Sequence, residues 1–327
     1  MMSKPEDPFN HNDLRCPACG SRLHRLKNEL LCDKKTCRLT FPIVDGIPVM
    51  IDERRSVFQQ RDYLERKDTF FKNTARPTLG KKVFHLLPKL SCNISAAANY
   101  QKLAGRLLRQ HPHPKVLILG GSIIGEGIKV LLRFPDLRLI ETDVSFGPRT
   151  AVIVDAHQIP FPDGYFDAVI VQAVLEHVAD APACVAEIWR VLKSRALVYA
   201  ETPFMQPIHG WPYDFTRYTP IGHRRLFRQF DELASGIVNG PGVALAEIIK
   251  NFLMAFFQSG IMQKIATLFV HLTAFGLKYF DYYLAGRRDS ALAASGYYFM
   301  GQKRRTSVTD KEILNEYRIR QGYFLKP

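Results

Sequence analysis

The chain has 327 residues, of which 46% are hydrophobic and 23% charged, and a surplus of Lys and Arg gives a net charge of +14. This composition excludes wholesale disorder and fibrous architecture, and the length predicts about two domains. The first ten residues lack the apolar core of a secretory signal, and six cysteines in so long a chain argue for a reduced compartment, so we expect a cytoplasmic protein. The positive charge suits an anionic partner such as RNA, a phosphorylated substrate or a lipid surface, without choosing among them.

Four of the six cysteines form two close pairs within the first 37 residues. Such paired spacing is typical of a zinc ribbon, in which two turns each supply two thiolates to one tetrahedral ion. The alternative is four free thiols on a loop. We predict a zinc-ribbon domain over residues 1–53. The predicted Zn²⁺ ligands are Cys16, Cys19, Cys32 and Cys37.

Residues 54–98 mix charges with scattered aromatic side chains, and we predict a helical linker that packs on the next domain. From Lys115 onward, apolar strand-like runs alternate with a helical pattern, which is typical of a parallel sheet covered by helices on both faces. We therefore predict an α/β, Rossmann-like doubly wound sheet over residues 99–303. The expected strands are 116–119, 137–143, 167–171 and 196–200, with a helix over 181–193.

A glycine-rich turn containing Gly120, Gly121 and Gly125 follows the first predicted strand. In a doubly wound sheet this turn lies at the edge where ligands bind. Asp143 ends the second strand, where a carboxylate can accept hydrogen bonds from both hydroxyls of an adenosine ribose. Dinucleotide enzymes and S-adenosylmethionine enzymes both use this device, so these residues alone leave the two classes open.

The segment 154–178 resembles the class I S-adenosylmethionine-dependent methyltransferases, and the resemblance extends over about residues 99–235. It implies that Asp155 meets the adenine amine and that Ala156 offers its backbone amide to the same base. It also implies that Gln172 lies beside the methionine end of the cofactor.

The cysteine-rich segment has a resemblance of its own. Its runs Phe41-Pro-Ile and Asp45-Gly-Ile-Pro resemble the small zinc proteins that activate tRNA and ribosomal RNA methyltransferases as separate subunits. The resemblance implies that such a module is fused to a methyltransferase in this chain.

A loop rich in polar and aromatic residues follows the predicted strand 196–200 and is expected to face the reacting methyl group. His209 is the predicted general base, and Asp214 would orient it or bind a substrate hydroxyl. Arg217 would hold an anionic group. The alternative is a structural network in which Asp214 pairs with Arg217 and the backbone satisfies His209.

Residues 243–285 are apolar with helical spacing, but Lys250, Lys264 and Lys278 interrupt them, which favours a surface position over a membrane span. Packing on the chain's own domain is one interpretation, and peripheral membrane contact or a dimer seam are the others. Because Tyr297-Tyr-Phe-Met resembles the last strand of the methyltransferase sheet, residues 243–292 would form a helical insertion. Residues 304–327 would then be a basic C-terminal tail.

The leading hypothesis is an enzyme that uses S-adenosylmethionine and carries Zn²⁺, and that methylates a hydroxyl or amine of a small or carbohydrate-like (glycan) metabolite. An RNA-modifying methyltransferase is less favoured, because the sequence lacks a concentrated stripe of basic and aromatic residues. A third hypothesis is a non-catalytic scaffold, because Ser122, Ile123 and Ile124 replace the small residues usual in the glycine-rich loop. The oligomeric state stays open.

Overall fold

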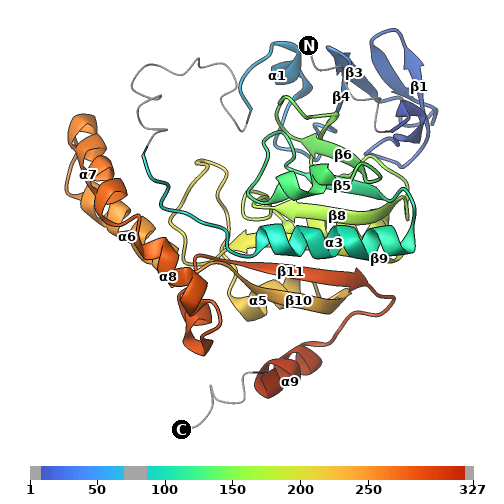
Figure 1. Cartoon of the computed structure of the whole chain (residues 1–327). Helices are drawn as coiled ribbons and strands as arrows, with labels where there is room; N and C mark the ends of the chain where they lie inside the picture. Colours follow the sequence, from blue (N-terminus) through green and yellow to red (C-terminus); the bar gives the residue numbers. More distant parts are fainter. Residues whose placement is uncertain (1–8, 70–86, 321–327) are drawn as a thin grey trace.

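The computed structural model describes residues 9–69 and 87–320, and it is built around one eleven-stranded sheet (Figure 1). The strand order is β1-β2-β3-β4-β7-β6-β5-β8-β9-β11-β10. Parts of the expected linker 54–98 and of the expected tail 304–327 lie outside the described residues. The strands are β1 (Leu23–Leu26), β2 (Glu29–Cys32), β3 (Thr40–Val44), β4 (Ile47–Met50), β5 (Lys115–Leu119), β6 (Arg138–Asp143), β7 (Val152–Val154), β8 (Phe166–Gln172), β9 (Leu192–Pro203), β10 (Phe230–Asn239) and β11 (Gly296–Lys303). The α-helices are α1 (Gln60–Leu64), α3 (Ala96–Gln110), α4 (Ala181–Val191), α5 (Pro220–Leu226), α6 (Pro241–Ala255), α7 (Gly260–Thr273), α8 (Leu277–Leu284) and α9 (Asp310–Arg320).

The predicted doubly wound sheet is confirmed by β7, β6, β5, β8 and β9, which pair in parallel. The apolar runs are buried on both faces, as the alternation of side chains along a strand requires. Val116 and Ile118 of β5 pack with α3 on one face, whereas Leu117 and Leu119 pack with α4 on the other. The carboxyl ends of these strands therefore meet at a single edge of the sheet.

Two features of this sheet differ from the expectation. The strand β10 was not predicted, and it pairs antiparallel with β11, which itself runs antiparallel to β9. The helical pattern expected after the glycine-rich turn is a short 3₁₀ helix, Ile128–Arg133. Gly127 precedes it with φ +83°, and a Cβ there would lie 2.7 Å from that of Ala96 at the start of α3, so the position directly before this helix requires glycine.

The cysteine-rich domain is joined to the main sheet, because β4 pairs in parallel with β7 through Val49–Ile153 and Met50–Val154 (Figure 1). The core of this domain also continues into the larger domain, because the rings of Phe9 and Phe161 pack edge to face. Their centroids are 5.6 Å apart. These contacts make β4 the bridge between the cysteine cluster and the carboxyl edge of the sheet.

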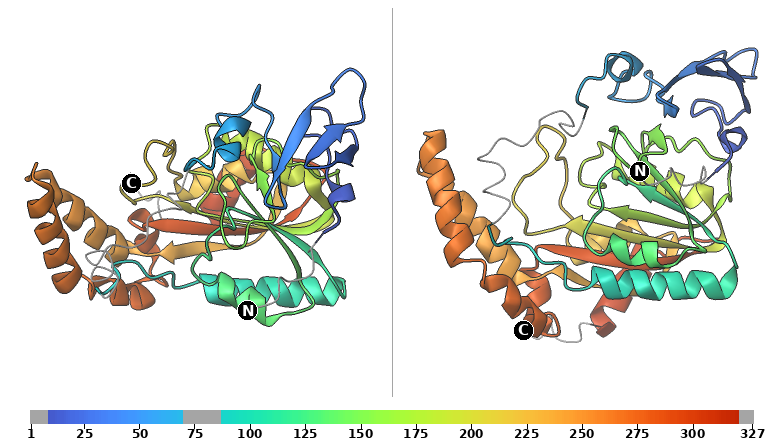
Figure 2. Two further views of the ribbon diagram at one scale, coloured as in Figure 1. Left: turned by 90° about the horizontal axis from the view of Figure 1, so that it is seen from above. Right: turned by 45° about the horizontal axis from the view of Figure 1, so that its top comes forward.

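Helices α6, α7 and α8 form an arm that projects from the side of the sheet (Figures 1 and 2). In the amino-acid sequence these three helices lie between β10 and β11, where a helical insertion was predicted. Within the described part of the chain no single helix has the length and hydropathy of a membrane span, although α7 and α8 together meet the criterion as a pair bent by 47°. The expected tail contains the helix α9 in its described part.

Candidate functional site

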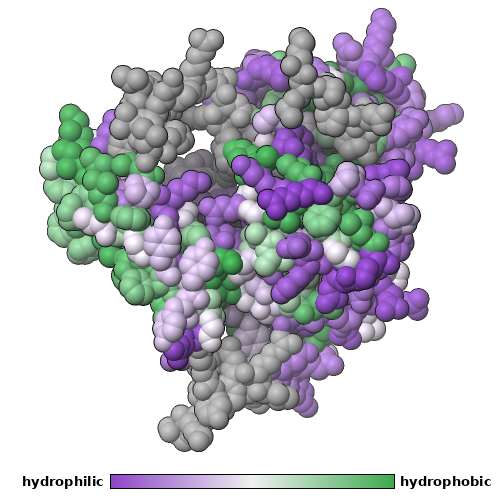
Figure 3. All heavy atoms as spheres, viewed as in Figure 1, coloured by the Kyte–Doolittle hydropathy of each residue, from purple (hydrophilic) through white to green (hydrophobic). Residues whose placement is uncertain are grey.

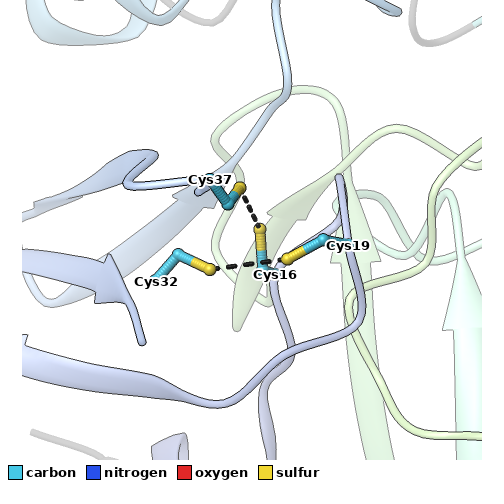
Figure 4. Close-up of side chains that lie close together, drawn as sticks. All are labelled: Cys16, Cys19, Cys32 and Cys37. Carbon is cyan, nitrogen blue, oxygen red and sulfur yellow. Dashed lines mark hydrogen bonds between the residues drawn. The ribbon is translucent and has the colours of Figure 1, made fainter. Parts of the chain in front are cut away.

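The four cysteine thiols of the N-terminal domain converge on one point (Figure 4). The Sγ atoms of Cys16 and Cys37 are 3.8 Å apart, and those of Cys19 and Cys32 are 3.5 Å apart. Tetrahedral Zn–S bonds of about 2.3 Å place sulfur atoms about 3.8 Å from one another, so the four thiols fit one zinc ion. They can hold the ion in a closed structural site, since all four positions of a tetrahedron would be taken by protein sulfur.

The turns that carry these thiols explain their spacing. In the first, the N–H of Gly20 donates to the carbonyl of Cys16 at 2.8 Å, and Gly20 has φ +70°. In the second turn, the backbone N–H of Arg38 donates to the carbonyl of Lys34 at 3.1 Å, and Arg38 has φ +49°. Each turn thus needs a left-handed residue directly after its second cysteine, which glycine supplies in one case and Arg38 in the other.

An apolar pocket opens at the carboxyl edge of the sheet, between β5, β6, β7 and β8. Its walls come from Phe58 of the linker, Val174 and Phe215, and its polar groups include the carboxylates of Asp143 and Asp155. Four predicted cofactor residues therefore line one pocket, namely Gly120, Asp143, Asp155 and Ala156. An apolar slot that also contains two carboxylates suits a nucleoside, whose base is flat and whose ribose offers hydroxyl donors.

The two carboxylates of the apolar pocket are held by different partners. Asp143 accepts the backbone N–H of Ser122 at 3.1 Å and of Ser145 at 2.9 Å, and burial raises its pKa. Asp155 is also buried, but hydrogen bonds from His157 and Ser56 outweigh the burial and lower its pKa. Both side chains are fixed in place, as a binding site for hydroxyl and amine donors requires.

The three glycines of the glycine-rich turn have separate roles. Gly120 has φ +76°, and a Cβ there would lie 2.4 Å from Val174, so only glycine fits between the strand and the pocket wall. At Gly121 a Cβ would meet the side chain of Glu141 at 2.9 Å. At Gly125 it would lie 2.1 Å from the Gln172 amide oxygen. Gly120 lines the apolar pocket, whereas Gly125 and Gln172 line a second cavity.

This second cavity, the polar cavity, has a volume of about 440 Å³ and shares Leu119, Gly120 and Ala173 with the apolar pocket. The described residues around it include no Lys or Arg. Its carboxylates are those of Glu126, Glu176, Glu201 and Glu247. An acidic cavity in a chain of net charge +14 disfavours a phosphate and favours a hydroxylated or amine ligand.

Glu201 is a titratable group of the polar cavity that the sequence analysis did not predict as a site residue. It lies near the end of β9, is 5% exposed, and accepts hydrogen bonds from Tyr199, Gln172 and Asn93. Burial raises its pKa to about 7. The signal available in the sequence was its position, because a carboxylate at the carboxyl end of a central strand faces the ligand edge.

The loop after β9 places His209 in the polar cavity and turns Asp214 and Arg217 toward each other. Asp214 accepts the backbone N–H of His209 at 2.6 Å, and Arg217 also donates to the carbonyls of Gln206 and Pro207. The His209 ring faces Glu176, whose carboxylate raises the pKa of the imidazole. The proposed catalytic roles of these three residues stay predictions, and the loop has the internal pairing foreseen in the structural alternative.

Two regions of the chain match known protein families. Residues 133–200 match the family described as a methyltransferase domain, and residues 7–46 match the Trm112p-like proteins. A UPF0434 protein of Methylobacillus flagellatus is 55% identical over 42 residues, which are 12% of this chain and 67% of that protein. The chain carries a methyltransferase domain and, at its N-terminus, a Trm112-like domain. Both resemblances seen in the sequence are thereby confirmed.

Further similarities concern the same two regions. A UPF0434 protein of Nitrosococcus oceani is 43% identical over 51 residues, covering 15% of this chain and 83% of that protein. Among solved structures, a chain from the complex of the Haloferax volcanii Trm112 methyltransferase activator with a methyltransferase is 17% identical to this chain, with a TM-score of 0.37. The match covers 64% of this chain and 93% of that chain. Geranyl diphosphate C-methyltransferase of Streptomyces coelicolor is 13% identical, with a TM-score of 0.38. This match covers 62% of this chain and 76% of that protein's chain.

Proposed function

We propose that the protein transfers the methyl group of S-adenosylmethionine to a hydroxyl or amine of a small or carbohydrate-like molecule held in the polar cavity. The observation that carries this proposal is the junction of the two cavities at Leu119, Gly120 and Ala173. A cofactor whose adenosine occupies the apolar pocket would direct its methionine end past the carboxyl end of β5 toward the polar cavity. Holding donor and acceptor in line is the main contribution of the protein to such a displacement.

The chemistry of the polar cavity supports the class of acceptor. Its carboxylates and amides can orient hydroxyl or ammonium groups, while their negative charge would repel the phosphates of RNA. A methylated hydroxyl or amine loses a proton, which must be taken up nearby. His209 and Glu201 are the two groups of the cavity suited to that role, and the pKa of Glu201, raised to about 7 by burial, lies near neutrality.

The experiment is incubation of the purified chain with methyl-labelled S-adenosylmethionine and cell extract, followed by separation of small molecules from RNA. We expect label in the small-molecule fraction, and expect its loss in Asp143→Ala. The exposed Asp136→Ala serves as the matched control. Label in RNA would favour the RNA-modifying alternative, and absence of any label together with absence of cofactor binding would favour the scaffold.

A further inference from the structure

Three side chains of metal-ligand type meet where the apolar pocket joins the polar cavity. The Glu176 Oε1 atom lies 3.8 Å from His177 Nε2 and 3.8 Å from His209 Nε2. One potential ligand atom from each residue lies within 4.8 Å of the other two. The group is separate from the four cysteine thiols, since His177 lines the apolar pocket, and Glu176 and His209 line the polar cavity.

The Glu176 carboxylate is buried in surroundings that favour binding of a cation. It is fully buried, and within the described residues neither of its oxygens has a hydrogen-bond partner. A buried carboxylate left without partners is strongly unfavourable, so such groups are paired or bind metals. The Nε2 atoms of His177 and His209 each lie 3.8 Å from Oε1, a distance too long for a hydrogen bond.

The two histidines are held in the orientation that metal ligands require. His177 Nδ1 lies 2.5 Å from the carbonyl oxygen of Tyr213, and His209 Nδ1 lies 3.3 Å from that of Pro207. A carbonyl only accepts hydrogen bonds, so the Nδ1 of His177 carries a proton, and its Nε2 is the nitrogen that faces Glu176. The Nδ1 of His209 also lies 3.4 Å from the Arg217 guanidinium, and its Nε2 likewise faces Glu176. Metal-binding histidines typically donate their second N–H to a carbonyl or carboxylate in this way.

We propose that Glu176, His177 and His209 bind one divalent transition-metal ion of the zinc type, with open coordination positions facing the polar cavity. Two imidazoles and one carboxylate form a three-ligand set that leaves a position open in catalytic zinc sites. If the proposed methyl transfer holds, the ion would bind the acceptor oxygen or nitrogen and acidify it, and Glu201 would be left to receive the proton. Metal binding itself does not depend on that function.

The test is the zinc content of the full chain after equilibration with Zn²⁺ and desalting. We expect about two zinc ions per chain in the parent, one of them at the four cysteines, and about one in His209→Ala and in the nearly isosteric Glu176→Gln. His113→Ala, an exposed histidine elsewhere, should keep both. Cobalt separates the sites further, because thiolate ligands give intense charge-transfer absorption and a histidine–carboxylate site does not.

Folding and cofactor binding are followed in parallel, by thermal melting and by S-adenosylmethionine titration of Glu176→Gln. A parent chain with one zinc, unchanged in both variants, would overturn the proposal and leave a protonated Glu176–His209 pair as the explanation. Because metal is measured without acceptor, two zinc ions in a chain that binds no S-adenosylmethionine would uphold this site while refuting the proposed function.

A different observation concerns the arm of helices α6, α7 and α8. Large apolar side chains recur every fourth residue along one stripe of α6 and one of α7, and each of them is at least 41% exposed. Six of them are Ile248, Phe252, Phe256, Ile261, Ile265 and Phe269. In the space-filling view hydrophobic side chains gather over the upper part of the arm, where α6 and α7 lie, and more polar ones over its lower part (Figure 3). Monomeric soluble proteins rarely expose so large an apolar surface without a partner.

The charges of the arm indicate which partner this surface suits. Its acidic residues are turned inward, because Asp281 is fully buried against the N–H groups at the start of α6 and Glu247 lines the polar cavity. Lys264 of α7 is exposed, and beyond α8 the exposed Arg287 is balanced by the exposed Asp289. The outward-facing charge is therefore positive, which complements an anionic lipid surface and opposes a second copy of a chain with net charge +14.

We infer that the arm lies on the surface of a membrane containing anionic lipids, with its apolar stripes in the interface. Apolar stripes flanked by basic residues are typical of interfacial helices. Since Glu247 of α6 also lines the polar cavity, this placement would bring the cavity close to the lipid headgroups.

Cosedimentation with phosphatidylcholine vesicles, with and without phosphatidylglycerol, tests this inference. We expect binding to the anionic vesicles, weakened by salt and lost in the double variant Ile261→Glu/Phe269→Glu. Leu314→Glu, which changes an exposed leucine of α9, is the matched control. Equal binding by the double variant, or no binding by the parent, would overturn the inference. Self-association that the same variant abolishes, without vesicle binding, would assign the surface to a second copy instead.

Discussion

The hydroxyl of Ser56 donates a hydrogen bond of 2.5 Å to the Asp155 carboxylate, linking the segment after the Trm112-like domain to the far end of the apolar pocket. The bond lies directly beyond the pairing of Met50 in β4 with Val154 in β7. Phe58, two residues further along, forms part of the pocket wall. The Trm112-like domain therefore shapes the pocket through β4 and the residues that follow it.

We expect Ser56→Ala to weaken S-adenosylmethionine binding roughly three- to tenfold, because Asp155 keeps its bonds to His157 but loses one that holds it in place. Isothermal titration calorimetry measures the effect, with the exposed Ser307→Ala as control. An unchanged dissociation constant would mean that Ser56 contributes nothing to the shape of the pocket.

Loss of a zinc thiolate should affect both domains. Cys32→Ser is expected to remove about one zinc ion per chain and to lower the melting temperature, because small zinc domains obtain about 10–16 kcal/mol from the metal. It should also reduce cofactor affinity, since β4 connects the cysteine cluster to Asp155. Metal analysis and thermal melting check this, with Cys92→Ser as control. A variant that loses zinc but melts at the parent temperature would show that the ion is dispensable for the fold.

The sequence predicted those parts of the fold that depend on local pattern. The apolar runs that became β5, β6, β8 and β9 are buried on both faces, so their composition alone marks them as strands. The strand β10 was missed because only its last residues are buried together, and its polar and apolar residues do not alternate cleanly. The pairing of β4 with β7 joins two residue runs about a hundred positions apart, and local pattern carries no information about such a contact.

In the candidate site, too, some residues could be placed from local sequence pattern, whereas others depend on tertiary structure. Asp143 and Asp155 could be placed in one pocket from their positions at strand ends, because parallel strands share a carboxyl edge. The meeting of Glu176 with His209 could not, because it depends on how the loop after β9 folds back over β8. The internal bonds of that loop, between Asp214 and Arg217, are likewise set by tertiary structure.

Arg217 and Asp214 are expected to act by positioning His209. Arg217→Ala removes donors to the carbonyls of Gln206 and Pro207, and we expect turnover to fall about tenfold or more while cofactor affinity stays within twofold. Arg217→Lys should restore little, because lysine cannot form the paired bonds to Asp214. Labelled methyl transfer and calorimetry measure the two quantities. A raised acceptor Michaelis constant with unchanged turnover would instead assign Arg217 to acceptor binding.

Glu201 should make stability dependent on pH. Its pKa of about 7 in the folded chain lies above the value of about 4.3 expected when unfolded, so the folded state binds this proton more tightly. The stabilisation it provides is complete below about pH 4 and is lost as the pH rises through about 7. Glu201→Gln should flatten the decline in melting temperature between about pH 5 and 7.5. Identical pH profiles for parent and variant would contradict the raised pKa.

We expect the apolar pocket to bind S-adenosylmethionine through Asp143. Calorimetric titration, which measures the stoichiometry and affinity of cofactor binding, tests this most directly. We predict one cofactor bound per chain, with affinity reduced on the order of tenfold or more in Asp143→Ala, since two charge-assisted hydrogen bonds are lost. The exposed Asp136→Ala should bind like the parent. Failure of the parent chain to bind S-adenosylmethionine, or equal binding by Asp143→Ala, would contradict the account.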